Sequence, residues 1–194
     1  DQTSGSAGGS VDTTINGGTT AFSVAQDVVA INVSSVNDAP VLDNTGTMTL
    51  PTITKSQTNN GGQDVSAIVA SAGGDRIIDV DSGAVEGIAI TSVSGTYGTW
   101  QYNTGSGWTD VGVVSSTNAL LLRAADSLRF VPDGTNADTG TVLFQAWDQT
   151  SGTAGTKVDS SVSGGTAAFS SQVEVAIISV TAVNDEQVIA TNTG

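Results

Sequence analysis

The sequence repeats itself with an offset of 147 residues, and this repeat constrains the fold more than any other feature of the chain. Residues 36–41 read VNDAPV and residues 183–188 read VNDEQV (183 − 36 = 147). Upstream of these motifs, the segment DQTSG occupies residues 1–5 and returns at residues 148–152. A fixed offset between similar segments is the signature of a tandem array, so we expect repeated structural units.

The offset divides the chain into three parts. We expect residues 1–38 to be the C-terminal loop and last strand of a preceding repeat, residues 39–185 to be one complete repeat, and residues 186–194 to begin a following one. The length of 194 residues suits one or two domains. Because the chain starts inside a repeat, we expect targeting signals to lie elsewhere in a longer parent protein.

The charge balance excludes one large class of partners. Nineteen acidic residues stand against five basic ones, and the formal net charge is −14. Binding to nucleic acid through its phosphates needs basic patches, so no nucleic-acid partner is expected. An acidic surface attracts divalent cations instead. The alternative, that the acidic residues serve only solubility, stays open.

The residue types that are absent narrow the chemistry further. The sequence contains no cysteine and no histidine. Disulfides and nucleophile–histidine triads are therefore excluded, and we expect no enzyme activity. A transition-metal site is not expected without thiolate or imidazole ligands, whereas a hard cation bound by oxygen atoms is compatible with the composition. No apolar run approaches the roughly 20 residues of a membrane-spanning helix, so no membrane insertion is expected.

Short β-branched and apolar segments recur along the chain, separated by Gly-rich turns, and no stretch shows sustained helical periodicity. The predicted strands are residues 27–36, 41–42 with 48–54, 65–70, 87–93, 99–103 with 108–113, 119–123, 128–131, 141–147 and 172–183. Many short strands at regular spacing are typical of an all-β fold, and we predict an antiparallel β-sandwich.

One predicted strand has no obvious partner. Residues 27–36 are the copy of residues 172–183, which we expect to close the sheet beside residues 141–147. The other strands of the preceding repeat are absent, so residues 27–36 would leave backbone groups unpaired. The segment could stay loose, pair within its own chain, or complement another copy. We predict that it joins a sheet, and favour pairing with another copy of the chain.

The linker motif VNDAPV and a series of short blocks together resemble a known family. The blocks are Gly87–Thr91, Gly98–Tyr102, Leu120–Leu122, Arg129–Asp133 and Ala146–Gly152. In order and spacing they resemble cadherin-like tandem domains of very large bacterial surface proteins, including RTX-type adhesins, over nearly the whole chain. The sequence departs from that pattern at Lys55–Gln57, where similar repeats carry acids, and at Glu186–Gln187 in the second linker.

The resemblance carries several expectations. It implies a cadherin- or immunoglobulin-like sandwich, an extracellular location at the cell surface, and a role as a structural spacer between neighbouring repeats of the same polypeptide. Cadherin-like linkers commonly bind Ca²⁺. The parent protein would bind a glycan or another cell-surface ligand. Two alternatives stay open: a glycan-binding module, and a subunit of an extracellular filament assembled by strand donation.

The resemblance places a group of oxygen-bearing side chains at the domain end that receives the linker. The candidate calcium ligands there are Asn37, Asp38, Asp79, Asp81 and Asp148, with Glu86 as a further candidate. Ca²⁺ is bound by six to eight oxygen atoms, from carboxylates and carbonyls. The competing interpretation is that these aspartates cap turns, which is a common role of Asp.

A second site is a weaker expectation at the other linker, where Asn184 and Asp185 lie and which Asp126 could approach. Separately, the predicted hairpin carries Trp100, Tyr102 and Trp108. Three aromatic rings could form a platform that stacks a sugar. We favour the alternative that they are core and cross-strand partners, because aromatic pairs stabilise hairpins.

Overall fold

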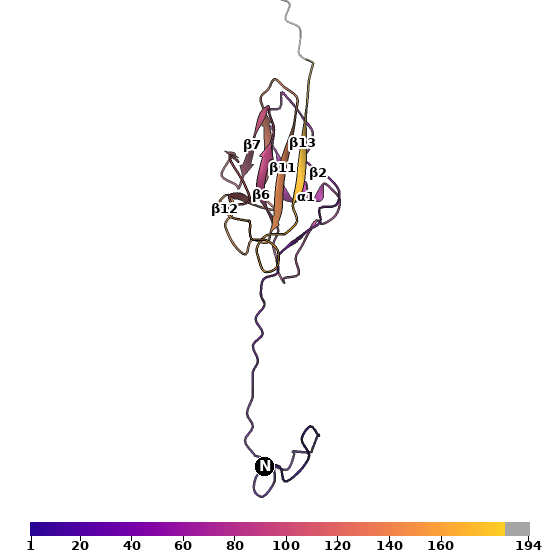
Figure 1. Cartoon of the computed structure of the whole chain (residues 1–194), viewed down its shortest axis with the longest axis vertical. Coiled ribbons are helices and arrows are strands. Elements are labelled where there is room, and N and C mark those ends of the chain that lie inside the picture. The colour runs from indigo at the N-terminus through magenta and orange to yellow at the C-terminus, as the bar shows by residue number, and fades with distance from the viewer. Residues whose placement is uncertain (185–194) are drawn as a thin grey trace, which may run out of the picture. The chain divides into compact units, whose positions relative to one another are not determined.

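The computed structural model describes residues 1–184 of the chain (Figure 1). The chain divides into two compact units, Asp1–Ser35 and Val36–Gly194. The linker residues Val36, Asn37 and Asp38 therefore belong to the second unit.

The first unit consists of turns and extended chain, and no strand or helix is assigned over the described residues 1–40. Residues 27–36 therefore form no strand within the single chain, and their pairing with another copy stays a prediction. Val29, Ile31 and Val33 are 88%, 86% and 91% exposed. The β-branched pattern is present, but a strand exists only when a neighbouring strand accepts and donates its backbone hydrogen bonds.

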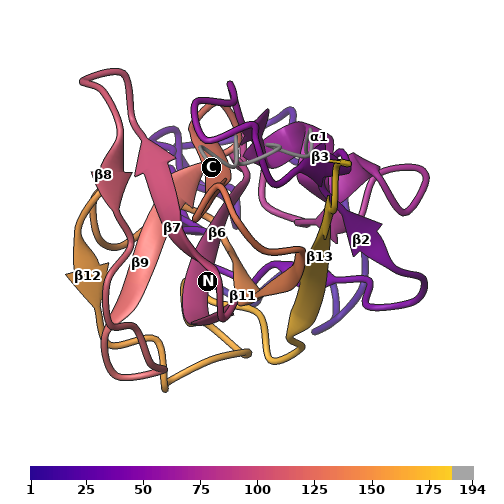
Figure 2. The same ribbon diagram turned by 90° about the horizontal axis from the view of Figure 1, so that it is seen from above.

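The second unit contains many short strands and one short helix among its described residues (Figures 1 and 2). In chain order the elements are β1 (Val41–Leu42), β2 (Met48–Thr49), β3 (Ile53–Thr54), β4 (Gln63–Asp64), α1 (Val65–Ala70), β5 (Ile77–Ile78), β6 (Gly87–Ser94), β7 (Gly98–Asn103), β8 (Thr109–Asp110), β9 (Ala119–Arg123), β10 (Ser127–Pro132), β11 (Asp138–Trp147), β12 (Lys157–Val158) and β13 (Glu174–Thr181). The predicted hairpin is confirmed as β7 and β8, and the predicted closing strand as β13.

Two sheets enclose the core. The larger has the order β12-β9-β6-β11-β13-β2, with β3 also paired to β13, and the smaller has the order β4-β10-β7-β8; β1 and β5 form a separate pair. The prediction of an all-β sandwich is confirmed. Its antiparallel character holds for all described strand pairs except two, because β2 and β3 run parallel to β13.

Alternation along β11 shows how the sequence builds the core. Val142, Phe144 and Ala146 are buried in the main cluster, which also contains Ile88, Ile90, Leu120, Leu122 and Ile178. Since successive side chains on a strand point to opposite faces, Trp147 lies on the other face. There it forms a second cluster with Leu121 and Phe169, which belongs to the loop between β12 and β13.

The segment Val65–Ala70 was predicted as a strand and is a helix, α1. Its buried residues Val65, Ile68 and Val69 follow helical spacing, which a run of only six residues cannot distinguish from a buried strand. In the described part of the chain, no helix is long and apolar enough to cross a membrane.

Candidate functional site at the linker-accepting end

The linker is held against the end of the second unit by hydrogen bonds from Asn37 and Ala39. The Asn37 side-chain Nδ2 donates to Oδ2 of Asp148 at 2.9 Å and lies 3.4 Å from the carbonyl oxygens of Thr166 and Ala167. Two residues later, the backbone N–H of Ala39 donates to the carbonyl of Gly165 at 2.8 Å. These contacts join the start of the repeat to the loop that precedes β13.

The aspartates of the predicted site also meet at this end. The backbone N–H of Asp38 donates to Oδ2 of Asp81 at 2.9 Å, and the N–H of Asp81 donates to Oδ1 of Asp79 at 2.8 Å. A cavity of about 250 Å³ is lined by Asn37, Asp79, Asp81 and Asp148. The structure therefore brings four of the predicted side chains to one cavity, with Asp38 bonded beside them. Asp185 lies outside the described residues.

The fold explains why distant residues converge here. Asp148 directly follows the last residue of β11, and Asp79 and Asp81 lie in the loop between β5 and β6. Gln149 adopts a φ of 65°, an unusual conformation for a residue other than glycine. Its side-chain nitrogen donates to the carbonyl of Glu86 at 2.7 Å, which ties the start of β6 to the end of β11.

The turn-capping interpretation of these aspartates has direct support. Oδ1 of Asp148 accepts the backbone N–H of Thr150 at 2.8 Å and its hydroxyl at 2.6 Å. The bond from the Asp81 N–H to Asp79 has the same two-residue spacing, which is the pattern of an Asx-turn. Both aspartates thus stabilise their own loops.

One carboxylate oxygen at this end of the domain has no hydrogen-bond partner among the described residues. Oδ2 of Asp79 is buried and accepts no hydrogen bond from any described residue. A buried carboxylate oxygen without a partner is costly, so this atom is suited to a bound cation. Nearby, burial raises the pKa of Glu86, and the negative charge of Asp75 adds to this effect. In residues 1–184, however, no three acidic side chains converge closely enough to form a ready-made metal site.

The second linker site does not receive Asp126. This residue is buried and bonded to Arg123, with Oδ1 2.7 Å from the guanidinium and Oδ2 accepting the Arg123 backbone N–H at 2.7 Å. Asp126 directly precedes β10. At the other end of β10, Pro132 pairs with Gly98, the preceding residue Tyr97 donates to Asp138, and Asp138 pairs with Val180 near the C-terminal end of β13. The expectation that Asp126 approaches the second linker is wrong, because β10 separates the two places. Asn184 is exposed.

The aromatic residues of the β7–β8 hairpin form no platform. Trp100 is 4% exposed, lies edge-on to Phe130 at a centroid distance of 5.3 Å, and donates from Nε1 to Ser94 O at 2.7 Å. The guanidinium carbon of Arg129 lies over Trp108, 4.2 Å from the centroid of the Trp108 ring. The Tyr102 hydroxyl reaches the carbonyl of Gly155 at 3.3 Å. Trp100 belongs to the main core cluster and Tyr102 packs against it, which confirms the interpretation for these two rings, whereas Trp108 is half-buried and stacks on Arg129.

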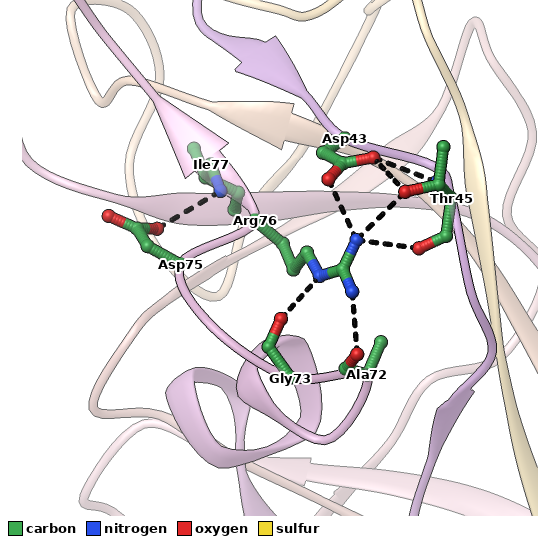
Figure 3. Close-up of polar contacts among 7 residues, drawn as sticks. All are labelled: Asp43, Thr45, Ala72, Gly73, Asp75, Arg76 and Ile77. Carbon is green, nitrogen blue, oxygen red and sulfur yellow. Dashed lines mark hydrogen bonds and ion pairs between the residues drawn. The ribbon is translucent and has the colours of Figure 1, made fainter.

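An ion pair that the sequence reasoning missed lies near β1 and α1 (Figure 3). Arg76 donates from Nη1 to Oδ2 of Asp43 at 2.7 Å and to the Thr45 carbonyl at 2.6 Å, and from Nε to the Gly73 carbonyl at 2.7 Å. Hydrogen bonds from Thr45 lower the pKa of Asp43, and Arg76 adds to this. The cluster clamps the loop after β1 to the end of α1, and no local sequence signal joins residues 33 positions apart.

No family model, no curated protein and no solved structure matches the chain.

Proposed function

We propose that this chain is a structural extender repeat of an extracellular, cell-surface adhesin, and that Ca²⁺ at the interdomain linker makes the joint rigid. The observation that carries the proposal is the docked linker. Asn37 and Asp38 bond to Asp148 and Asp81, and the same linker motif returns 147 residues later (183 − 36 = 147). A joint that recurs at the repeat spacing suits a rod better than a single binding tip.

The donor set at the joint is compatible with a hard cation. It consists of oxygen atoms from carboxylates, an amide and backbone carbonyls, which is the chemistry that Ca²⁺ prefers. Asp79, Asp81 and Asp148 would supply carboxylates, and Oδ2 of Asp79, which accepts no hydrogen bond from a described residue, would be free to coordinate. Asn37 and Asp38 would complete the site from the linker. Binding would draw these side chains closer together and neutralise their mutual repulsion.

Calcium titration with thermal unfolding as the readout tests this proposal. A cation that binds only the folded chain stabilises it by about 2.7 kcal/mol at a hundredfold excess over its dissociation constant. We expect the Tm to rise with Ca²⁺ and to fall in EDTA. Replacing Asp79 and Asp81 together by Asn should remove most of the rise.

The repeat supplies a matched control for this experiment. Asp1 occupies the position of Asp148 in the first copy and makes the same bonds to a threonine two residues later. Asp148→Asn should weaken the response to calcium, and Asp1→Asn should leave it unchanged. A Tm that is the same in Ca²⁺ and in EDTA, with metal removal verified, contradicts the proposal.

A second candidate function, a filament subunit assembled by strand donation, is favoured by one observation. Val29, Ile31 and Val33 are exposed, although the matching positions in β13 are buried. Deleting residues 1–36 and measuring mass by light scattering tests it. Strand donation predicts that the full-length chain assembles and that the chain lacking residues 1–36 is monomeric. A full-length chain that is monomeric at high concentration rules it out.

A further inference from the structure

The amide of Asn37 has only acceptors around its nitrogen. Nδ2 lies 2.9 Å from a carboxylate oxygen of Asp148 and 3.4 Å from the carbonyl oxygens of Thr166 and Ala167. A carboxylate accepts hydrogen bonds and donates none, so the nitrogen of the amide must face Asp148. Asn37 therefore acts here through its nitrogen as a hydrogen-bond donor, whereas a cation would be bound by the amide oxygen Oδ1.

The acceptors are held in place by a tight turn. Gly164 and Gly165 have φ values of 72° and 60°. The N–H of Gly164 donates to the Phe169 carbonyl at 2.8 Å, and the N–H of Ala167 donates to the Gly164 carbonyl at 3.1 Å. Left-handed glycines allow successive carbonyls to project from one side of such a turn. The carbonyl of Gly165 receives Ala39, and the next two carbonyls lie near Asn37.

The same turn forms in the first unit, where no hydrogen bond joins it to a linker among the described residues. Gly17 and Gly18 have φ values of 76° and 58°, and Gly17 N–H donates to the Phe22 carbonyl at 2.8 Å. The conformation of the turn thus follows from its own sequence and does not require the linker.

We propose that the Gly164–Ala167 turn and Asp148 form a socket that binds the Asn37–Ala39 segment of the linker without a metal ion. The linker then belongs to the repeat that follows it. In a tandem array, Asn184 would insert into the corresponding turn of the next repeat. This socket stands independently of the calcium proposal, because its bonds run from N–H donors to oxygen acceptors.

The socket requires an amide at position 37. Aspartate has the same shape, but at neutral pH it cannot donate, and its charge would lie beside the carboxylate of Asp148. Alanine removes the donor and leaves three acceptors without it. Asn184 is the matched control, because it is the repeat counterpart of Asn37 and is exposed in this chain.

Hydrogen exchange of the full chain in EDTA at pH 7 tests the socket. The Ala39 amide should exchange at least tenfold more slowly, relative to its intrinsic rate, than the amides of residues 28–33 in the same molecule. Asn37→Ala should abolish most of this protection, Asn37→Asp should abolish it completely, and Asn184→Ala should leave it unchanged.

Different experimental outcomes contradict the socket proposal and the calcium proposal. Protection of Ala39 that appears only when Ca²⁺ is added overturns the socket and leaves the calcium site standing. An Ala39 amide that is protected in EDTA and unaffected by Asn37→Ala also overturns the socket. Protection in EDTA that Asn37→Ala removes, together with a Tm indifferent to calcium, supports the socket and refutes the metal.

Discussion

Residues 1–35 and residues 148–182 are two copies of one sequence pattern, and the structure gives both the same turns but forms strands only in the second copy. In both copies an aspartate accepts hydrogen bonds from a threonine two residues later, at Asp1 and at Asp148. The N-terminal ammonium group of Asp1 donates to Ala21 O at 3.0 Å, and the backbone N–H of Asp148 donates to Ala168 O at 3.1 Å. The loop is closed in the same way in each copy.

Glycines at matched positions of the two copies also have the same backbone conformation. Gly5 and Gly152 have φ values of 83° and 82°, and Gly8 and Gly155 both have 79°. The C-terminal parts of the copies differ completely. Ala176, Ile178 and Val180 are 1%, 2% and 3% exposed within β13, whereas their counterparts at residues 29, 31 and 33 are almost fully exposed.

The difference separates two kinds of interaction. The turns depend mainly on hydrogen bonds between residues a few positions apart, which the first copy retains. The strand depends on β11, β2 and β3, which pair with β13 in the second unit. A strand without such partners leaves its backbone groups to solvent and its apolar side chains exposed.

The largest effect should come from truncating matched strand residues. Ile178→Ala should lower the free energy of unfolding of the second unit by about 2–5 kcal/mol, because it removes buried methylene groups and leaves a cavity. Ile31→Ala should change it by less than about 0.5 kcal/mol. Tryptophan fluorescence in denaturant reports this, since Trp100, Trp108 and Trp147 all lie in the second unit. An equal loss at Ile31 would show that the first copy is packed, as strand donation requires.

A smaller effect is expected at the paired glycine turns. Gly165→Ala should destabilise the second unit by about 1 kcal/mol, because a residue with a Cβ is strained at positive φ. No described heavy atom lies within 4 Å of a Cβ built at Gly165 or at Gly18, so the cost is one of backbone conformation. The Tm of the second unit should fall for Gly165→Ala and stay unchanged for Gly18→Ala. Gly165→Asn should cost less than Gly165→Ala, and the reverse order would argue against backbone strain.

The smallest effect concerns two exposed aspartates at matched positions. Hydrogen bonds from Ser161 lower the pKa of Asp159, and hydrogen bonds from Thr14 lower the pKa of Asp12. A lowered carboxyl pKa contributes stability above the unfolded value, and this is lost as the pH falls through the folded pKa. Asp159→Asn should therefore slightly lower the Tm at pH 7, and the gap should close below about pH 3.8.

The matched variant Asp12→Asn should leave the unfolding of the second unit unchanged at every pH. A Tm difference between Asp159→Asn and the unmodified chain that persists at pH 2 would show that the carboxylate acts through something other than its lowered pKa.

Sequence reasoning identified the candidate site only in part. The linker motif and the family resemblance predicted that one group of side chains would meet at one end of the domain. The group consists of Asn37, Asp38, Asp79, Asp81 and Asp148. The socket was missed, since the Gly164–Ala167 segment reads as an ordinary Gly/Ser/Thr loop. The role of Asn37 as a donor depends on which atoms of the folded chain surround its amide, and no sequence pattern reports that.

The sequence by itself determined the repeat, the all-β class, the turns and the buried face of β11, because these follow from spacings of a few residues and from side-chain alternation. Tertiary structure decided the rest. It made residues 65–70 a helix, placed β2 and β3 parallel to β13, and left residues 27–36 without a strand. Each of these outcomes depends on partners distant in the sequence, and a strand pattern becomes a strand only where a neighbouring backbone completes its hydrogen bonds.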